Sequence, residues 1–124
     1  MSSKSRPRTP PRVGPADGVD PRVCYIADAL RVVGDRYALL VLREVVLGVH
    51  RFNDIRVNTG APRETLATRL RQLEAAGLIE RHAYSERPPR DEYVLTDAGR
   101  AIAPVLEALR DWGERHAPHP AGTY

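Results

Sequence analysis

The side chains best suited to chemistry lie in one stretch, "RETLATRLRQLEAAGLIER", residues 63–81. Leu66, Leu70 and Leu73 are spaced 4 and 3 apart, which predicts a helix with one apolar stripe. The opposite face carries hydroxyls, an amide and arginines, which are groups that bind nucleic-acid base edges and backbone phosphates. The candidate base-reading residues are Thr65, Thr68 and Gln72, and the candidate phosphate or guanine contacts are Arg63, Arg69 and Arg71.

Taken alone, this helix leaves two interpretations open. Its outward face is either a DNA-reading surface or an ordinary solvated helix face. Arg69 lies close to the apolar edge of the helical wheel, so it could instead fix the helix to a neighbouring element. The elements on either side of the helix decide between the interpretations.

The segment before this helix, "HRFNDIRVNTG", predicts a short helix with Phe52 and Ile55 facing inward. Residues 58–60 are expected to form a turn, and Pro62 stands near the first position of the next helix, where its missing N–H does no harm. A short helix, a glycine-containing turn and a second helix with polar outward residues predict a helix-turn-helix. This context favours DNA reading.

Four further residues are candidates for DNA contacts. Arg51 and Asn53 stand at the start of the short helix, where phosphate is favoured, although a capping and solvation role fits them comparably well. Two β-prone segments, residues 78–84 and 91–95, flank "SERPPR" and predict a hairpin that would form a wing. At this wing, Arg87 and Arg90 could enter the minor groove or hold phosphates. They could alternatively form ion pairs with Glu86, Asp91 or Glu92.

The N-terminal half predicts two helices that support this unit. The first is expected to begin at Pro21 and to end at Gly34, and Asp35 is a suitable N-cap for the second. The second helix, "RYALLVLREVVLG", is apolar nearly all round and is therefore expected to be central and buried.

The C-terminal part predicts one long helix that Thr96 caps. Its apolar residues are spaced 4, 3, 4 and 3 apart, which forms a heptad-like seam that suits dimerisation. The residues of this seam are Ala98, Ile102, Val105, Leu109 and Trp112. Pro104 is expected to kink the helix.

Length and charge set the frame for these elements. The 124 residues suit one domain, and 42% hydrophobic residues allow an ordinary core. Residues 51–90 hold eight arginines and five acids, whereas residues 91–124 hold three arginines and six acids. This asymmetry indicates a side that faces a polyanion. The preference for arginine over lysine could equally reflect genome composition.

The termini and the cysteine count exclude several classes of protein. Residues 1–22 are rich in Pro, Ser, Gly and Arg and predict a disordered basic tail, which is either a solvated leader or a nonspecific DNA tether. Residues 23–124 form the predicted domain. With neither a transmembrane-length apolar run nor a signal peptide in the sequence, a cytoplasmic protein without a membrane partner is expected. A single cysteine, Cys24, excludes an internal disulfide framework.

Five segments together resemble one family. The segments "CYIADALRVVGDRYALLVLREVVLG", "RFNDI", "LATRLRQLEAAGLIER", "YSERPPRDEYVLTDAGR" and "PVLEALRDWG" are similar in order and spacing to HxlR-type winged helix-turn-helix transcription regulators. The resemblance covers about residues 24–112. The chain departs from the family pattern at Tyr25, where proline is common, and at residues 35–37, where a Gly-Lys-Trp-like segment is common.

The resemblance implies a bacterial, dimeric DNA-binding regulator whose first and last helices form the dimer interface. The implied interface residues are Ile26, Leu30, Ile102, Val105, Leu109 and Trp112. It also implies a cysteine near the start of the first helix, which in some members senses oxidants or electrophiles, and Cys24 has that place. Without the resemblance, Cys24 is more simply a small buried apolar residue.

The sequence therefore predicts a mainly α fold with a small β-hairpin (α+β), a winged helix-turn-helix with flanking dimerisation helices. The expected function is a homodimeric, sequence-specific regulator, a repressor that binds an inverted-repeat operator in double-stranded DNA and responds to a small-molecule effector or a redox signal. The alternative is a winged-helix module for protein interaction or ligand binding without operator binding. No enzyme, cofactor or metal site is predicted, since His116 and His119 have no third ligand.

Overall fold

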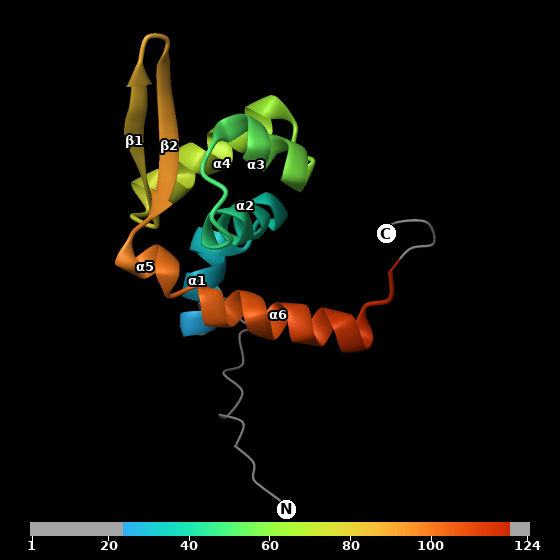
Figure 1. Ribbon diagram of the computed structural model, residues 1–124. Helices are drawn as coiled ribbons and strands as arrows, with labels where there is room; N and C mark the ends of the chain where they lie inside the picture. Colours follow the sequence, from blue (N-terminus) through green and yellow to red (C-terminus); the bar gives the residue numbers. More distant parts are fainter. Residues whose placement is uncertain (1–23, 120–124) are drawn as a thin grey trace, which may run out of the picture.

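The computed structural model of the protein describes residues 24–119. The predicted tail, residues 1–22, and the last five residues lie outside this range. The elements are α1 (Tyr25–Val33), α2 (Arg36–Val46), α3 (Phe52–Thr59), α4 (Arg63–Ala75), β1 (Ile79–Glu86), β2 (Pro89–Leu95), α5 (Asp97–Arg100) and α6 (Ala103–His116). Figure 1 shows α3 and α4 beside the hairpin, with α2 beneath them and α6 running along the opposite side. This arrangement confirms the predicted winged helix-turn-helix.

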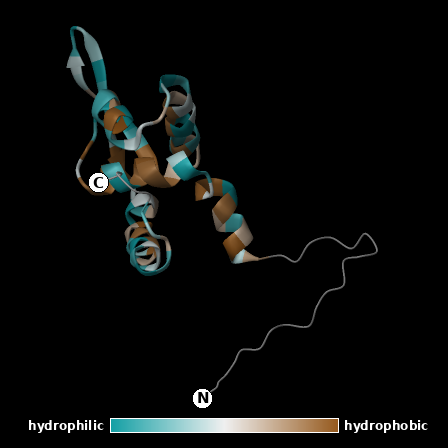
Figure 2. Ribbon diagram, turned by 90° about the vertical axis from the view of Figure 1, so that its right-hand side faces the viewer, coloured by the Kyte–Doolittle hydropathy of each residue, from teal (hydrophilic) through white to brown (hydrophobic). Residues whose placement is uncertain are grey.

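The core lies where α2 contacts α3 and α4. Its largest fully buried side chains come from α2, α3, α4 and the start of β1, and they are Val41, Leu42, Ile55, Leu66, Leu70, Leu73 and Ile79. The apolar stripe predicted for α4 is thus the face that packs on α2. In Figure 2 the helices that form the core carry hydrophobic segments, whereas the outer part of the hairpin is hydrophilic. The central position predicted for α2 is confirmed, but its burial is not complete, because Val46 and Leu47 at its C-terminal end are exposed.

Asp35 caps α2 as the sequence predicts. Its Oδ1 accepts hydrogen bonds from the backbone N–H groups of Tyr37 and Ala38, at 2.8 and 3.2 Å. The prediction for α1 is wrong at its start, because Cys24 has an extended backbone and is itself the N-cap. The helix therefore begins at Tyr25 rather than at Pro21.

The turn of the helix-turn-helix is shorter than the sequence predicts. Asn58 and Thr59 are still helical, and Thr59 Oγ1 donates a hydrogen bond of 2.8 Å to the carbonyl of Ile55. Gly60 ends α3 with φ of 72°, a left-handed conformation that favours glycine. Pro62 is the N-cap of α4, so the first helical residue is Arg63.

The hairpin is longer than predicted. β1 and β2 pair antiparallel from Ile79 opposite Leu95 to Glu86 opposite Pro89, so the strands include most of "SERPPR". Only Arg87 and Pro88 remain as the connection. The wing arginines therefore lie at the far end of a ladder that is anchored in the core at Ile79.

The predicted long C-terminal helix is two helices. Thr96 caps the short α5, as its Oγ1 accepts from the N–H of Gly99 at 3.1 Å. The ring of Pro104 cannot be accommodated over the carbonyl of Arg100, four residues earlier, so α5 ends there. Pro104 then lies in the first turn of α6 and no kink is formed.

Gly99 allows α5 to approach the backbone that leads into β1. A Cβ atom at this position would lie 2.1 Å from the carbonyl oxygen of Leu78, closer than any real contact. The Thr96 hydroxyl adds a second link, since it donates to the carbonyl of Gly77 at 2.6 Å. The base of the wing and the helix that leads to α6 are therefore joined backbone to backbone.

Candidate nucleic-acid interface

The outward face of α4 presents the side chains that the sequence proposes for DNA reading. Arg63, Arg71 and Gln72 are exposed, and Thr65 and Thr68 are half-buried. Arg71 Nη2 donates to Thr68 Oγ1 at 3.3 Å, which leaves most of the guanidinium free for another acceptor. This face can therefore offer donors and acceptors to a groove of DNA.

Arg69 differs from these residues, because its guanidinium is held by two side chains of the protein. Its Nε lies 2.8 Å from Asp35 Oδ1, and its Nη1 donates to Gln72 Oε1 at 2.8 Å. The Arg69 guanidinium holds the pKa of Asp35 below its usual value; burial opposes this shift, and the amides of Tyr37 and Ala38 add to it. The geometry favours the interpretation that Arg69 fixes α4 to the start of α2.

The wing arginines, Arg87 and Arg90, are both exposed. No ion pair among residues 24–119 involves Arg87 or Arg90. Asp91 instead lies 3.8 Å from Arg81, and Glu92 lies 3.8 Å from Arg51. The ion-pair alternative for the wing arginines is therefore not formed within the described residues.

Arg51 links α3 to the wing. Its guanidinium lies 4.3 Å from the centre of the Tyr84 ring on β1, within the range of a cation–π contact. Arg51 also forms an isolated β-bridge with Glu92. A hollow of about 330 Å³ lies between α3 and the hairpin, and Asn53 and Arg90 line it together with Arg51 and Tyr84. The structure thus brings three of the predicted DNA-binding residues together around Tyr84, which the sequence analysis missed.

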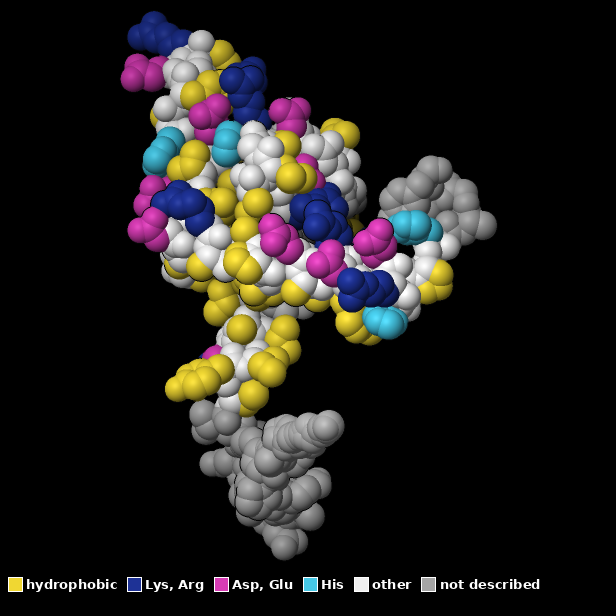
Figure 3. All heavy atoms as spheres, turned by 60° about the horizontal axis from the view of Figure 1, so that its bottom comes forward, with side chains coloured by type: hydrophobic (Ala, Val, Ile, Leu, Met, Phe, Trp, Pro, Cys, Tyr) yellow, Lys and Arg dark blue, Asp and Glu magenta, His cyan; other side chains and the backbone are white. Residues whose placement is uncertain are grey.

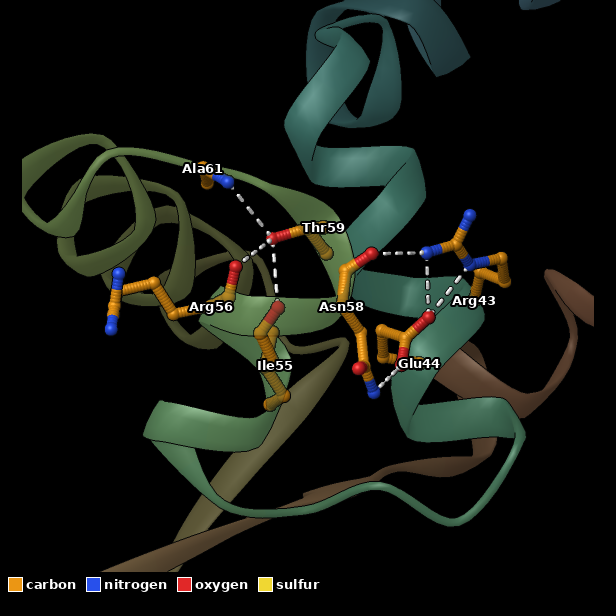
Figure 4. Close-up of polar contacts among 7 residues, drawn as sticks. All are labelled: Arg43, Glu44, Ile55, Arg56, Asn58, Thr59 and Ala61. Carbon is orange, nitrogen blue, oxygen red and sulfur yellow. Dashed lines mark hydrogen bonds and ion pairs between the residues drawn. The ribbon is translucent and has the colours of Figure 1, made fainter. Parts of the chain in front are cut away.

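A buried carboxylate on α2 links this helix to the helix-turn-helix. Glu44 on α2 is 4% exposed, and its two oxygens accept from Arg43 Nε and from Asn58 Nδ2, each at 2.8 Å. Figure 4 shows Arg43 also reaching the carbonyl oxygen of Asn58, at 3.3 Å. Thr59 Oγ1 in turn accepts from the N–H of Ala61 at 3.3 Å. This cluster ties α2 to the end of α3 and to the turn before α4.

The residues proposed for dimerisation are mostly exposed and apolar. On α1, Ile26 is 71% exposed, and on α6, Trp112 is 61% exposed. Figure 3 shows hydrophobic side chains gathered over α1. Tyr25, Leu30, Val105 and Leu109 belong to the same group of large exposed apolar residues.

Two members of the predicted seam lie elsewhere. Ile102 packs partly buried against the core, and Ala98 lies on α5 rather than on α6. The seam is broken because α5 ends before α6 begins. The exposed apolar surface is thus formed by α1 and by Val105, Leu109 and Trp112 of α6.

Cys24 is a half-buried free thiol at the N-terminus of α1. Arg31, a nearby basic residue on the same helix, forms an ion pair of 2.8 Å with Asp28. Among residues 24–119, no group of three metal-binding side chains comes together, and the ring of His116 contacts Trp112 instead. None of the helices described here has the length and apolar character required to cross a membrane.

Comparison with known proteins agrees with this geometry. A family model described as an HxlR-like helix-turn-helix matches residues 32–121. An uncharacterized HTH-type transcriptional regulator of Mycobacterium tuberculosis is 45% identical over 97 residues, and the match spans 78% of this chain but only 61% of that protein. An HTH-type transcriptional regulator of Methanothermobacter thermautotrophicus is 38% identical over 103 residues, covering 82% of this chain and 79% of the relative. The oxidized form of the redox regulator HypR superposes with a TM-score of 0.69 at 30% identity, covering 77% of this chain and all of that one.

Proposed function

The chain belongs to the HxlR-like helix-turn-helix family, and from this premise we propose that it is a dimeric regulator of transcription that binds double-stranded DNA at an inverted repeat. Its relatives in M. tuberculosis and M. thermautotrophicus are HTH-type transcriptional regulators. Regulation by a protein of this kind needs specific binding rather than a catalytic centre.

The observation that carries the proposal is the set of free guanidinium groups on α4 and the wing. Arg63, Arg71, Arg87 and Arg90 are exposed, and none forms an ion pair within residues 24–119. A protein that leaves several arginines unpaired on one recognition helix and its wing can neutralise phosphates and release their counterions. Thr65, Thr68 and Gln72 lie on the same helix and would read bases.

The exposed apolar surface on α1 and α6 supports a homodimer. Large apolar side chains gathered on one part of a small domain mark an interaction site, and in a twofold dimer the same patch serves both subunits. Two recognition helices would then enter successive major grooves, roughly 34–36 Å apart. The operator is accordingly an inverted repeat with half-sites about one helical turn apart.

We propose repression as the mode of action and Cys24 as a candidate for redox signalling. Cys24 is the N-cap of α1, so its oxidation would change the start of a helix that carries the proposed dimer surface. HypR, with 30% identity, is a redox regulator that has been solved in reduced and oxidized forms. Residues 24–119 contain no second cysteine, so a disulfide would join two subunits.

The test is to recover genomic fragments bound by the purified protein and to measure their affinity by electrophoretic mobility shift. Enrichment of one inverted repeat, bound with nanomolar affinity and in preference to shuffled duplex, is the expected result. Binding that is equal for all fragments, or no binding at low salt, would refute the proposed function.

A further inference from the structure

Strand β1 has one residue more than β2 in the outer part of the wing. Ala83 pairs with Asp91, and the next pair joins Ser85 to Arg90. Tyr84 therefore has no partner on β2 and is the extra residue of a β-bulge. Such bulges bend the strand and often lie beside functional sites, where they aim a side chain at another element.

The ring of Tyr84 carries the guanidinium of Arg51, the residue that precedes α3. The Cζ atom of Arg51 lies 4.3 Å from the centre of the ring. Glu92 lies 3.8 Å from Arg51 Nε, which is too long for a hydrogen bond, and it is the only acid within ion-pair distance of Arg51 among residues 24–119. The ring therefore restricts the guanidinium, while its Nη groups remain available for another acceptor.

This pair lies on the side of the molecule that we propose for DNA binding. Arg51 and Tyr84 line the hollow between α3 and the hairpin together with Asn53 and Arg90. Figure 1 shows α4, α3 and the hairpin beside one another. The side chain of Arg51 is 56% exposed, so a phosphate of bound DNA could accept from its Nη groups while the ring holds the side chain.

The contact between ring and guanidinium has two candidate roles. It could anchor the hairpin to α3, or it could place Arg51 for DNA. The hairpin already has an anchor in this region, because the N–H of Tyr93 donates to the carbonyl of His50 at 2.8 Å and His50 Nδ1 donates to the carbonyl of Tyr93 at 2.8 Å. The guanidinium of Arg51 has no comparable support besides the ring, which favours the second role.

We propose that Tyr84 is a positioning residue for DNA binding, which holds the guanidinium of Arg51 where a backbone phosphate accepts from it. The proposal rests on the proposed function, because it assigns a role to one residue of that interface. A mobile arginine loses rotamer freedom when it binds, at a cost that corresponds to about two- to tenfold in affinity. The ring imposes this restriction before DNA arrives, so the cost on binding is smaller.

The first measurement uses the full chain without DNA. NMR relaxation reports the mobility of the Arg51 Nε–H group, which should be rigid in the unaltered protein and in Tyr84→Phe, and mobile in Tyr84→Leu. The Nε–H group of Arg71 is the matched control, because Arg71 contacts no aromatic ring among residues 24–119, and it should behave alike in all three proteins. Equal mobility of Arg51 in the three proteins would overturn the proposal.

The second measurement is the affinity for a labelled duplex that carries the inverted repeat recovered from genomic DNA, by fluorescence anisotropy across a salt series. Tyr84→Leu should weaken binding by about two- to tenfold and leave the salt slope unchanged, because Arg51 still reaches its phosphate. Tyr84→Phe should bind like the unaltered protein. Arg51→Gln should reduce the slope by about 0.9, and adding Tyr84→Leu to it should weaken binding no further.

A protein without the wing arginines separates the two roles. In Arg87→Gln/Arg90→Gln, a ring that only anchors the hairpin has no wing contact left to place, so Tyr84→Leu would have no effect and the proposal would be wrong. A ring that holds Arg51 keeps its full effect there.

The effect of Tyr84→Leu on top of Arg51→Gln gives a further criterion. A loss as large as in the unaltered protein would show that Tyr84 does not act through Arg51 and would overturn its positioning role. If the unaltered protein bound no duplex although the Arg51 Nε–H group was rigid, the proposed function would fail, and the role of Tyr84 with it. Duplex binding that Tyr84→Leu left unchanged would refute the role of Tyr84 alone, so the two failures are distinguishable.

Discussion

Two neighbouring arginines on α4, Arg69 and Arg71, should respond in opposite ways when each is replaced by glutamine. Arg69 Nε lies 2.8 Å from Asp35 Oδ1, and the two side chains are 25% and 41% exposed. Water screens a pair of this exposure, so its contribution is at most ~1 kcal/mol. Arg69→Gln should therefore lower the free energy of unfolding by about 0.5–1 kcal/mol. Arg71→Gln should change it by less than about 0.5 kcal/mol, because Arg71 is exposed and has no acid partner among the described residues.

The effect on DNA binding should be the reverse. Each lost phosphate contact lowers the slope of log affinity against log salt by about 0.9. Arg71→Gln should show this loss, whereas Arg69→Gln should keep the slope of the unaltered protein. The slope is measured by fluorescence anisotropy on a labelled duplex across a salt series, and stability by urea unfolding at one fixed protein concentration.

Asp35→Asn serves as the control for Arg69. The amide oxygen retains the capping acceptor for Tyr37 and Ala38 but removes the charge that faces Arg69. It should therefore reproduce the stability loss of Arg69→Gln and leave the salt slope unchanged. If Arg69→Gln instead lowered the slope as much as Arg71→Gln and left unfolding unaffected, Arg69 would contact DNA and the reasoning from the ion pair would fail.

Leu109→Asp should convert the proposed dimer to a monomer, because it places a charge in the exposed apolar surface of α6; sedimentation at micromolar concentration measures this, and an unaltered protein that sediments as a monomer contradicts it. Mild peroxide should change operator affinity in the unaltered protein and not in Cys24→Ser, and an equal response of both would leave Cys24 a packing residue. Gln72→Ala should relax base preference at one position per half-site by roughly 1–3 kcal/mol, while Arg90→Ala should weaken all duplexes alike and reduce the salt slope; specificity lost in the second variant alone would reverse these roles. The pKa of Asp35 is lowered in the folded protein, so its stabilising contribution should be complete above the ordinary carboxyl pKa and disappear as the pH falls through the lowered value; Asp35→Asn should remove that part of the acid dependence of unfolding.

The features that the sequence predicts well depend on neighbours along the chain. Asp35 caps α2 because it follows Gly34 and precedes an apolar helix, and both signals are local. The stripe of Leu66, Leu70 and Leu73 is buried as the period requires. The helix-turn-helix and the wing could be predicted because they consist of such signals in order.

The errors come from competition between local signals. The apolar spacing of 4, 3, 4 and 3 predicts one continuous helix after Thr96. A continuous helix would require the Arg100 carbonyl to pack against the ring of Pro104, which clashes with it, so two helices form instead. The strands extend into "SERPPR" because the ladder needs only Arg87 and Pro88 as a connection. Periodicity indicates which residues share a face and does not indicate where a steric conflict divides the element.

The contacts that the sequence could not indicate join residues far apart in the chain. Glu44 lies in a mostly apolar helix, and no neighbour along the chain indicates that Asn58 will donate a hydrogen bond to it. The stacking of Arg51 on Tyr84 depends on the placement of the hairpin beside α3. The position of Arg69 on the helical wheel of α4 is compatible with a DNA contact and with a contact to a neighbouring element. Only the placement of Asp35 beside it favours the second role.

The contact at Gly99 has a mechanical consequence. Side chains between packed elements usually absorb small movements by changing rotamer, but no side chain separates α5 from the Leu78 carbonyl. A displacement of α6 is passed through the two residues that connect it to α5, and from there directly to the base of the hairpin. In the proposed dimer, α5 would therefore act as the fulcrum of the wing, and a small adjustment between the two subunits would become larger at the tip where Arg87 and Arg90 lie.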